Sequence, residues 1–180
     1  MKGDLKTALN LTEELLATGN LDLASIGLRI LDRFNRKLGG EYFLLFDKWV
    51  DYLNNWATTD HFSTHQICES IKDNPKLVKN LINWTNSDNR WRRRASSVAM
   101  VPIARKGEML EEVFMIADNL MIDEDDMVQK GVGWMLKEAS KTHPREIHEY
   151  LIEWKSKSPA LILRYASEKL PEDLKVLKTK

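Results

Sequence analysis

The sequence predicts an all-α protein whose helices pack in pairs as an α–α superhelix, or solenoid. No stretch of the 180 residues alternates apolar and polar side chains as a half-buried strand does, whereas apolar residues recur at helical spacing throughout. Arg94, Lys130 and Arg164 occupy similar places in three expected helices and lie 36 and 34 residues apart. A period of this length, with two helices in each repeat, is typical of HEAT-like and armadillo repeats.

About ten helices are expected, and residues that start or stop helices bound most of them. The glycines that end the first two are Gly19, Gly39 and Gly40, and the prolines that can begin others are Pro75, Pro144 and Pro159. Pro102 lies inside its helix and should kink it or end it early. The expected ranges are 4–18, 21–38, 41–55, 60–72 after a turn at 55–60, 75–84, 89–105, 108–121, 125–141, 144–154 and 159–170.

Length and composition indicate one domain over residues 1–180, with a frayed tail at 171–180. The chain is 43% hydrophobic and 30% charged, which suffices for one sizeable core. Cys68 is the only cysteine, so an intrachain disulfide is impossible. The sequence has no signal peptide and no run of 18 apolar residues, and we therefore expect an intracellular protein outside the membrane.

Charge is distributed unevenly along the chain, although the formal net charge is zero. Residues 87–106 contain six basic side chains and one acid, whereas residues 107–126 contain eight acids and no base. Arg90, Arg93 and Arg94 share one flank of an expected helix, and guanidinium groups bind phosphates through a planar fork of donors. Asp88 is the only acid close to them in sequence, so we expect them to contact a polyanion. The alternative is a solvated helix face with local ion pairs.

Trp134 is expected to lie off the core side of its helix. The apolar stripe of that helix runs through Val128, Gly131, Val132, Met135 and Ala139. Trp134 lies about 130° from the centre of this stripe, beside three lysines, Lys130, Lys137 and Lys141. An aromatic ring among lysines suits contact with a nucleoside whose phosphates the lysines bind. The alternative is packing against a neighbouring repeat.

Asp60 is expected in the first turn of the helix that runs to residue 72, four residues after Trp56. The two threonines between them, Thr58 and Thr59, could cap that helix. A helix N-terminus favours an ionised carboxylate, and a fixed carboxylate can stabilise a cation that forms nearby. The pair is therefore suited to the electrostatic stabilisation of a cation; the alternative is an acid that only stabilises the helix dipole, as first-turn acids commonly do.

The only arrangement that resembles a metal site consists of His61 and His65 with Cys68 and Glu69. The two histidines are spaced i, i+4, but no second cluster of histidine or cysteine completes the set, so no metal is expected. The sequence also lacks a glycine-rich phosphate loop, and neither a nucleotide nor another cofactor is expected.

Taken together, these residues resemble the AlkD-type alkylpurine DNA glycosylases, a family of HEAT-like-repeat DNA alkylation repair enzymes. The resemblance covers roughly residues 34–170 and depends on four motifs in the same order and at fitting separations. These motifs are Trp56-x-x-x-Asp60, Ser87-Asp88-Asn89-x-Trp91-x-x-Arg94-Ala95, Val128-Gln129-Lys130-Gly131-Val132-Gly133-Trp134 and Leu163-Arg164-Tyr165-Ala166-x-Glu168-Lys169.

The resemblance implies a monofunctional enzyme that hydrolyses the N-glycosidic bond of cationic alkylated purines in double-stranded DNA. The implied lesions are of the 3-methyladenine and 7-methylguanine type, and they are excised without flipping the damaged nucleotide. Asp60 would be the catalytic carboxylate, Trp56 and Trp134 would contact the sugar, and Arg94 would bind a phosphate. The full set of residues expected to bind DNA is Arg90, Arg93, Arg94, Lys130, Lys137, Lys141 and Arg164.

Two departures from the family are visible. Lys137 stands where relatives often have arginine, which keeps the charge but loses the bidentate fork. Relatives usually carry further N-terminal helices, and these are expected to be missing here. We expect a cytoplasmic monomer that associates with the nucleoid when it binds DNA. The main alternative is a non-catalytic HEAT-repeat scaffold that binds DNA or protein.

Overall fold

The computed structural model describes residues 4–177, which form helices α1 to α12 and contain no strand. This confirms the all-α class. The ten expected helical ranges become twelve α-helices because two of them are interrupted, one by a π-helical segment and one near Pro102. No helix among the described residues is long and apolar enough to cross a membrane. The chain forms two compact units, residues 1–78 and residues 79–180. A single domain over residues 1–180 stays a prediction.

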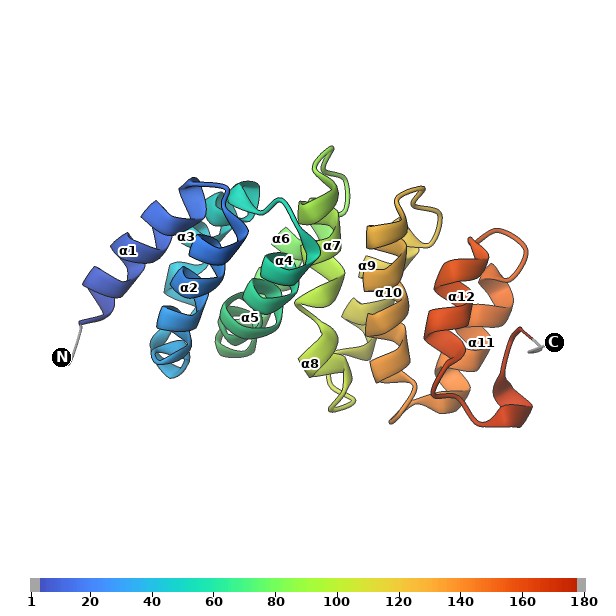
Figure 1. Ribbon diagram of the computed structural model, residues 1–180. Helices are drawn as coiled ribbons and strands as arrows, with labels where there is room; N and C mark the ends of the chain where they lie inside the picture. The colour runs from blue at the N-terminus through green and yellow to red at the C-terminus, as the bar shows by residue number, and fades with distance from the viewer. Residues whose placement is uncertain (1–3, 178–180) are drawn as a thin grey trace. The chain divides into compact units, whose positions relative to one another are not determined.

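The first unit begins with a pair of packed helices, α1 (Leu5–Ala17) and α2 (Leu21–Asp32) (Figure 1). Asp4 caps α1 and Asn20 caps α2, each through a side-chain oxygen that accepts backbone amide hydrogens. Gly27 allows the close approach of the two helices. A Cβ atom at position 27 would lie 3.3 Å from the Cα atom of Thr12, whose hydroxyl donates to the carbonyl of Gly27 at 2.9 Å.

The rest of the first unit is one long, interrupted helix and the shorter segments around it. Helix α4 (Trp56–Phe62), the π-helical segment η4 (Ser63–Ile67) and α5 (Cys68–Asp73) follow one another without a break. The shorter segments are η1 (Asn35–Lys37), η2 (Gly40–Tyr42), α3 (Phe43–Trp49), η3 (Val50–Tyr52) and η5 (Pro75–Leu77). Phe46, Trp49 and Phe62 form the aromatic core, with the rings of Phe46 and Phe62 packed edge to face at 5.3 Å.

The second unit contains the helices of the regular repeat. The first is α6 (Val78–Trp84), all of which except Val78 belongs to this unit. The others are α7 (Arg90–Val98), α8 (Val101–Ala104), α9 (Leu110–Leu120), α10 (Asp126–Ala139), α11 (Pro144–Trp154) and α12 (Ala160–Ser167). Helix α7 ends at Val98 and α8 begins at Val101, so Pro102 interrupts the helix as predicted. Asn89 caps α7 and Asp125 caps α10.

Helix α10 is the centre of the second unit, because it packs between α7 and α12 (Figure 1). Two glycines make this possible. A Cβ atom at Gly131 would lie 3.0 Å from the hydroxyl of Ser97 on α7, and one at Gly133 would lie 2.5 Å from the Cβ atom of Tyr165 on α12. The second helices of successive pairs therefore lie side by side, as the sequence period predicts for this unit.

The C-terminal tail differs from the expectation that residues 171–180 fray. Residues Glu172–Leu174 form the short helix η6, and Val176 is buried. The ring of His148 on α11 is hydrogen-bonded through Nδ1 to the carbonyl of Leu174 at 2.7 Å. This contact and the burial of Val176 hold the tail to the second unit. Residues 178–180 lie outside the described part of the chain.

Candidate functional site

Trp56 and Asp60 lie on the outer side of α4, one helical turn apart. The side chain of Trp56 is 57% exposed and that of Asp60 is partly exposed, whereas Thr58, Thr59 and Phe62 are buried. Residues four apart are neighbours on a helix surface. An indole and a carboxylate therefore share an accessible face of the first unit.

The start of α4 corrects the expected position of Asp60. The helix begins at Trp56, and its cap is Asn55, whose side-chain oxygen accepts the backbone amide of Thr58 at 3.0 Å. Thr59 does not cap the helix, because its hydroxyl donates to the carbonyl of Asn55 at 2.7 Å. Asp60 thus lies in the second turn, and the helix dipole, which acts within the first turn, does not supply the stabilisation of its carboxylate that the sequence suggested.

A change of helix type follows directly after this pair. The π-helical segment η4 begins at Ser63, and the hydroxyl of Thr64 donates to the carbonyl of Asp60 at 2.7 Å. Short π-helical insertions are rare and occur frequently at functional sites. No feature of the sequence indicates this segment, since its apolar spacing fits an ordinary helix.

Two arginines of α7, Arg90 and Arg93, pair with acids that are distant in sequence, a possibility that the expectation of a polyanion contact did not include. Arg93 donates from Nε to Asp123 at 2.7 Å, and Arg90 lies 3.1 Å from Asp125. Both acids belong to the acidic stretch 107–126, about thirty residues later in the chain. They reach α7 because they lie just before α10, which packs against it. Basic and acidic residues that occupy separate stretches of the sequence therefore lie next to one another in the fold.

Arg94 is the most deeply placed of the arginines, and only 5% of it is exposed. Its Nη1 donates to the carbonyl of Met127 in the first turn of α10. A phosphate-binding role for Arg94 stays a prediction. The described contact joins α7 to α10, and a guanidinium so placed contributes to their packing.

The three lysines of the α10 region also have acidic partners. The Nζ-to-carboxylate distances are 2.8 Å for Lys130 and Asp126, 3.1 Å for Lys137 and Glu168, and 2.6 Å for Lys141 and Glu138. The Lys130–Asp126 pair is exposed and therefore weak, so a phosphate can compete for Lys130, whereas the carboxylate of Glu138 is buried and binds Lys141 more firmly. Arg164 is exposed, and no ion pair of it is found within residues 4–177. DNA binding by these residues stays a prediction.

Trp134 is half-buried in the described structure. The stripe predicted for its helix is buried throughout, so Trp134 does lie off the main core side. Burial is wider than predicted, however, and includes Gln129, Leu136 and Glu138. The cause is that α10 packs against helices on two sides, whereas the periodicity predicts one buried side.

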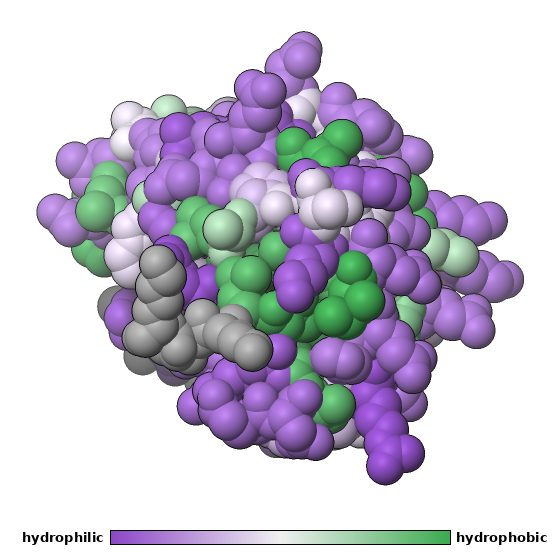
Figure 2. Space-filling view, turned by 90° about the vertical axis from the view of Figure 1, so that its right-hand side faces the viewer, coloured by the Kyte–Doolittle hydropathy of each residue, from purple (hydrophilic) through white to green (hydrophobic). Residues whose placement is uncertain are grey.

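Several large apolar side chains are exposed, and Trp56 is the only tryptophan among those found in the described residues. The others include Leu44, Ile122 and Ile152. Figure 2 shows one face of the molecule on which hydrophobic side chains gather in a patch among hydrophilic ones. An exposed apolar side chain alone is ordinary. An exposed indole beside a carboxylate offers a flat π face and a negative charge together, which suits a cationic ligand.

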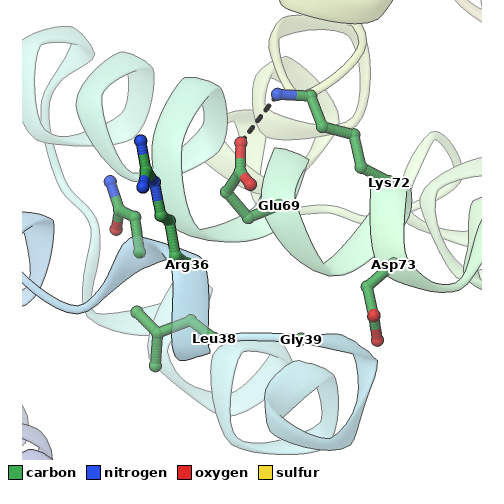
Figure 3. A pocket seen from close by; sticks show the side chains of 7 residues that line it. Arg36, Leu38, Gly39, Glu69, Lys72 and Asp73 are labelled. Carbon is green, nitrogen blue, oxygen red and sulfur yellow. Dashed lines mark hydrogen bonds and ion pairs between the residues drawn. The ribbon is translucent and has the colours of Figure 1, made fainter.

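A shallow cavity of about 240 Å³ lies in the first unit, between the η1 region and α5 (Figure 3). Within it Lys72 is bound to Glu69 at 2.7 Å, and the backbone amide of Gly40 donates to Asp73 at 2.8 Å. Burial opposes the charge of Lys72, but its hydrogen bond to the carboxylate of Glu69 and the nearby Cys68 raise the pKa of the lysine. Lys72 and Asp73 thus have partners within the cavity, and the lysine is a poor nucleophile.

A second polar cluster in the first unit joins Asp32, the last residue of α2, to the histidines of the α4 region. His61 Nε2 lies 3.0 Å from Asp32 Oδ1, and the rings of His61 and His65 stack at 4.4 Å. Burial lowers the pKa of His61 below its usual value, although Asp32 opposes the shift. Sequence reasoning missed Asp32, which precedes His61 by 29 residues and has no motif of its own.

Comparison with known proteins identifies the family. A model of the DNA alkylation repair enzyme family matches residues 1–170. The chain belongs to this family. A solved structure described as a predicted DNA alkylation repair enzyme from Enterococcus faecalis is similar in fold, with a TM-score of 0.81 and 16% sequence identity. The similarity covers 94% of this chain and 78% of that one. No curated protein matches the sequence.

Membership of the DNA alkylation repair enzyme family gives this chain a role in DNA repair, with DNA as its substrate. The resemblance inferred from the four motifs is thereby confirmed at the level of the family, and the all-α fold is that of the Enterococcus faecalis structure. The reaction and the individual residues that perform it are matters of proposal.

Proposed function

We propose that this chain is a monofunctional DNA glycosylase that releases cationic alkylated purines, of the 3-methyladenine and 7-methylguanine type, from double-stranded DNA without flipping the nucleotide. The observation that supports this most directly is the pairing of an exposed Trp56 with Asp60 on one face of α4. Membership of a DNA alkylation repair family supplies the substrate class.

The chemistry of a cationic base suits the few groups present. In an N3- or N7-alkylated purine the base already carries the positive charge, so it leaves without a protonating acid. The bond from the sugar C1′ to the base nitrogen breaks, its electron pair leaves with the base, and the base becomes neutral. The positive charge then lies on an oxocarbenium-like sugar, which a nearby anion stabilises.

In this proposal Asp60 provides that anion and positions the attacking water. Water forms the new bond to C1′, and its proton passes to the carboxylate and then to solvent. The indole faces of Trp56 and Trp134 would contact the sugar, whose C–H groups become polarised as the charge develops. The basic side chains of α7, α10 and α12 would bind the phosphates. A neutral base would be a far poorer leaving group, which predicts selectivity for cationic lesions.

The lysines argue against a lyase reaction. A lysine that forms a Schiff base is usually desolvated in an apolar pocket or placed beside another cation. Lys130 and Lys137 instead contact Asp126 and Glu168 on the surface of the second unit. We therefore expect an abasic site as the product, with the DNA strand intact.

A second candidate function, a non-catalytic DNA-binding scaffold, is favoured by the exposed ion pair of Lys130 with Asp126, which a phosphate can replace without any catalytic group. The two functions differ in their products. Incubation with dimethyl-sulfate-treated duplex, followed by chromatography of the released bases, should yield free 7-methylguanine and 3-methyladenine faster than the same duplex without protein. Binding of the duplex without release above that background would favour the scaffold, and an absence of both would contradict either function.

A further inference from the structure

Asp32, His61 and His65 bring three potential metal ligands together in the first unit. One ligand atom from each residue can be chosen so that all three lie within 4.8 Å of one another. Asp32 ends α2, His61 lies in α4 and His65 lies in η4. The cluster therefore connects two elements that the chain does not join directly.

The rings of the two histidines are stacked, and one ring must turn for both to bind the same ion, because a metal lies in the plane of each imidazole that ligates it. Their rings are nearly parallel, at 11°, and their centroids are 4.4 Å apart. His65 Nδ1 lies 2.9 Å from the carbonyl of His61, a contact in which the ring nitrogen must be the donor. A histidine that donates from one nitrogen to a carbonyl leaves the other nitrogen unprotonated as a ligand, and this is the usual arrangement at metal sites.

A buried glutamine orients the carboxylate. Gln66, which is fully buried, donates from Nε2 to Asp32 Oδ1 at 3.0 Å and to Asn35 Oδ1 at 2.8 Å. Its Oε1 is buried and has no hydrogen-bond partner in the described structure. Supporting contacts of this kind fix the orientation of metal-ligating carboxylates. The amide oxygen of Gln66 is therefore a buried hydrogen-bond acceptor beside the cluster that accepts no hydrogen bond.

We propose that Asp32, His61 and His65 form a binding site for a divalent transition metal of the Zn²⁺ class, which clips the end of α2 to the helix that carries Asp60. Zinc accepts two imidazoles and one carboxylate at about 2.0–2.2 Å, which places neighbouring ligand atoms about 3.3 Å apart in a tetrahedral site. The 3.0 Å between His61 Nε2 and Asp32 Oδ1 needs to widen by only a few tenths of an ångström.

The exposure and the chemical type of the three ligands determine how the coordination shell is completed and which metal ions the site selects. The side chains of His61 and Asp32 are 25% and 32% exposed, so solvent reaches the cluster and a water can complete the coordination shell. Two imidazole ligands select against Mg²⁺ and Ca²⁺, which require oxygen ligands. The site is independent of the proposed glycosylase reaction, because neither Trp56 nor Asp60 belongs to it.

Titration of the untagged, metal-free full-length chain with ZnCl₂ by isothermal calorimetry tests the proposal. We expect one equivalent to bind, and CoCl₂ to give the visible absorption of a site with nitrogen ligands. MgCl₂ should give no heat of binding. Asp32→Asn, His61→Gln and His65→Ala should each weaken Zn²⁺ binding by more than the roughly 10–100-fold typical of a lost supporting contact, and Gln66→Met should fall within that range.

The remaining histidines and the cysteine provide matched controls. The chain has four histidines, and the other two, His143 and His148, lie in the second unit. His143→Gln and Cys68→Ser should leave the affinity unchanged. Circular dichroism establishes that each variant is folded. The proposal is overturned if the wild-type chain does not bind Zn²⁺ at about micromolar concentration, if folded His65→Ala or Asp32→Asn binds normally, or if Cys68→Ser abolishes binding.

Discussion

The guanidinium of Arg93 is bound by the carboxylate of Asp123 through two of its nitrogens. Nε donates to Oδ2 at 2.7 Å and Nη2 to Oδ1 at 3.4 Å, while Nη1 donates to the carbonyl of Ser87 at 2.8 Å. The side chain of Asp123 is only 8% exposed. The arginine therefore joins the start of α7 to the loop before α10, and it is not available to DNA without breaking these bonds.

Asp123→Asn should accordingly destabilise the protein by about 1–3 kcal/mol, the range for a lost hydrogen bond to a charged group. It should also free Arg93 for a phosphate, which would make the salt dependence of duplex binding steeper by about one unit of slope. Chemical denaturation and binding at several salt concentrations measure the two effects. Glu149→Gln on α11 is the control, because its carboxylate is exposed and has no ion pair within the described residues, so its loss should neither destabilise the unit nor free a basic side chain. Equal effects of the two substitutions would contradict the structural role of Asp123.

Gly133→Ala should lower the melting temperature. Alanine in place of glycine normally stabilises a helix by about 0.5–1 kcal/mol. At position 133 the added Cβ would lie 2.5 Å from the Cβ of Tyr165 and 3.3 Å from the carbonyl oxygen of Ile162. Neither atom is the end of a flexible side chain, so α12 must move, at a cost of about 1–3 kcal/mol. A melting temperature equal to or above that of the wild type would show that α10 and α12 are less closely packed than described.

The acid sensitivity of the second unit should depend on Glu138. Burial opposes ionisation of this carboxylate, but hydrogen bonds from Lys141 and Arg105 lower its pKa below the ordinary 4.5. A carboxylate whose pKa is lower in the folded state stabilises that state fully above its unfolded pKa, and this stabilisation is lost as the pH falls through the folded pKa.

Glu138→Gln should thus reduce the free energy of unfolding at neutral pH, and the difference from wild type should shrink below about pH 4.5. Urea denaturation of both proteins between neutral pH and about pH 3 measures the difference. A difference that stays constant over this range would show that the pKa of Glu138 is not lowered by folding.

Trp134→Ala should cost about 1–3 kcal/mol of stability, less than a fully buried tryptophan, because Trp134 is half-buried. In the proposed reaction excision should fall much more than duplex affinity, since a ring that faces the sugar acts mainly as positive charge develops. Trp134→Phe keeps an aromatic face and should retain more activity. Single-turnover excision and a melting curve on the same samples separate the roles. A large loss of stability with unchanged excision per folded molecule would assign Trp134 to repeat packing.

The helical ranges were predictable because their information is local. Apolar spacing, Gly19 and Pro102 act within one or two turns, and the structure ends α1 just before Gly19 and interrupts the helix near Pro102 as the sequence predicted. The cap of α4 was missed because Asn55 competes with two threonines that follow it by three and four residues. Buried Thr58 and Thr59 were not recognisable as helix interior, so Asp60 was placed one turn too early.

The contacts between distant residues were not predictable in the same way. The acids at 123, 125 and 126 look separate from the arginines along the chain, yet the packing of α10 against α7 brings them together. Asp32 likewise meets His61 only through the packing of α2 against α4. Periodicity indicates which side of a helix is buried, but not which residue of another helix lies against it.

The catalytic role of Asp60 is the central proposal, and a substitution of the same size suits a side chain that is only partly exposed. Asp60→Asn removes the charge, keeps the size of the side chain and should preserve the fold and the duplex affinity. Glu14→Gln on α1 is the control, because it removes the same charge from an exposed position of the same unit.

The deciding measurement is the single-turnover rate of 7-methylguanine release from one defined duplex by wild type, Asp60→Asn and Glu14→Gln, each shown to be folded. The proposal predicts that Asp60→Asn releases the base about 10²-fold or more slowly, as for other deleted groups that stabilise transition-state charge, while Glu14→Gln matches the wild type. Near-normal release by folded Asp60→Asn would contradict the assignment of Asp60 as the catalytic carboxylate.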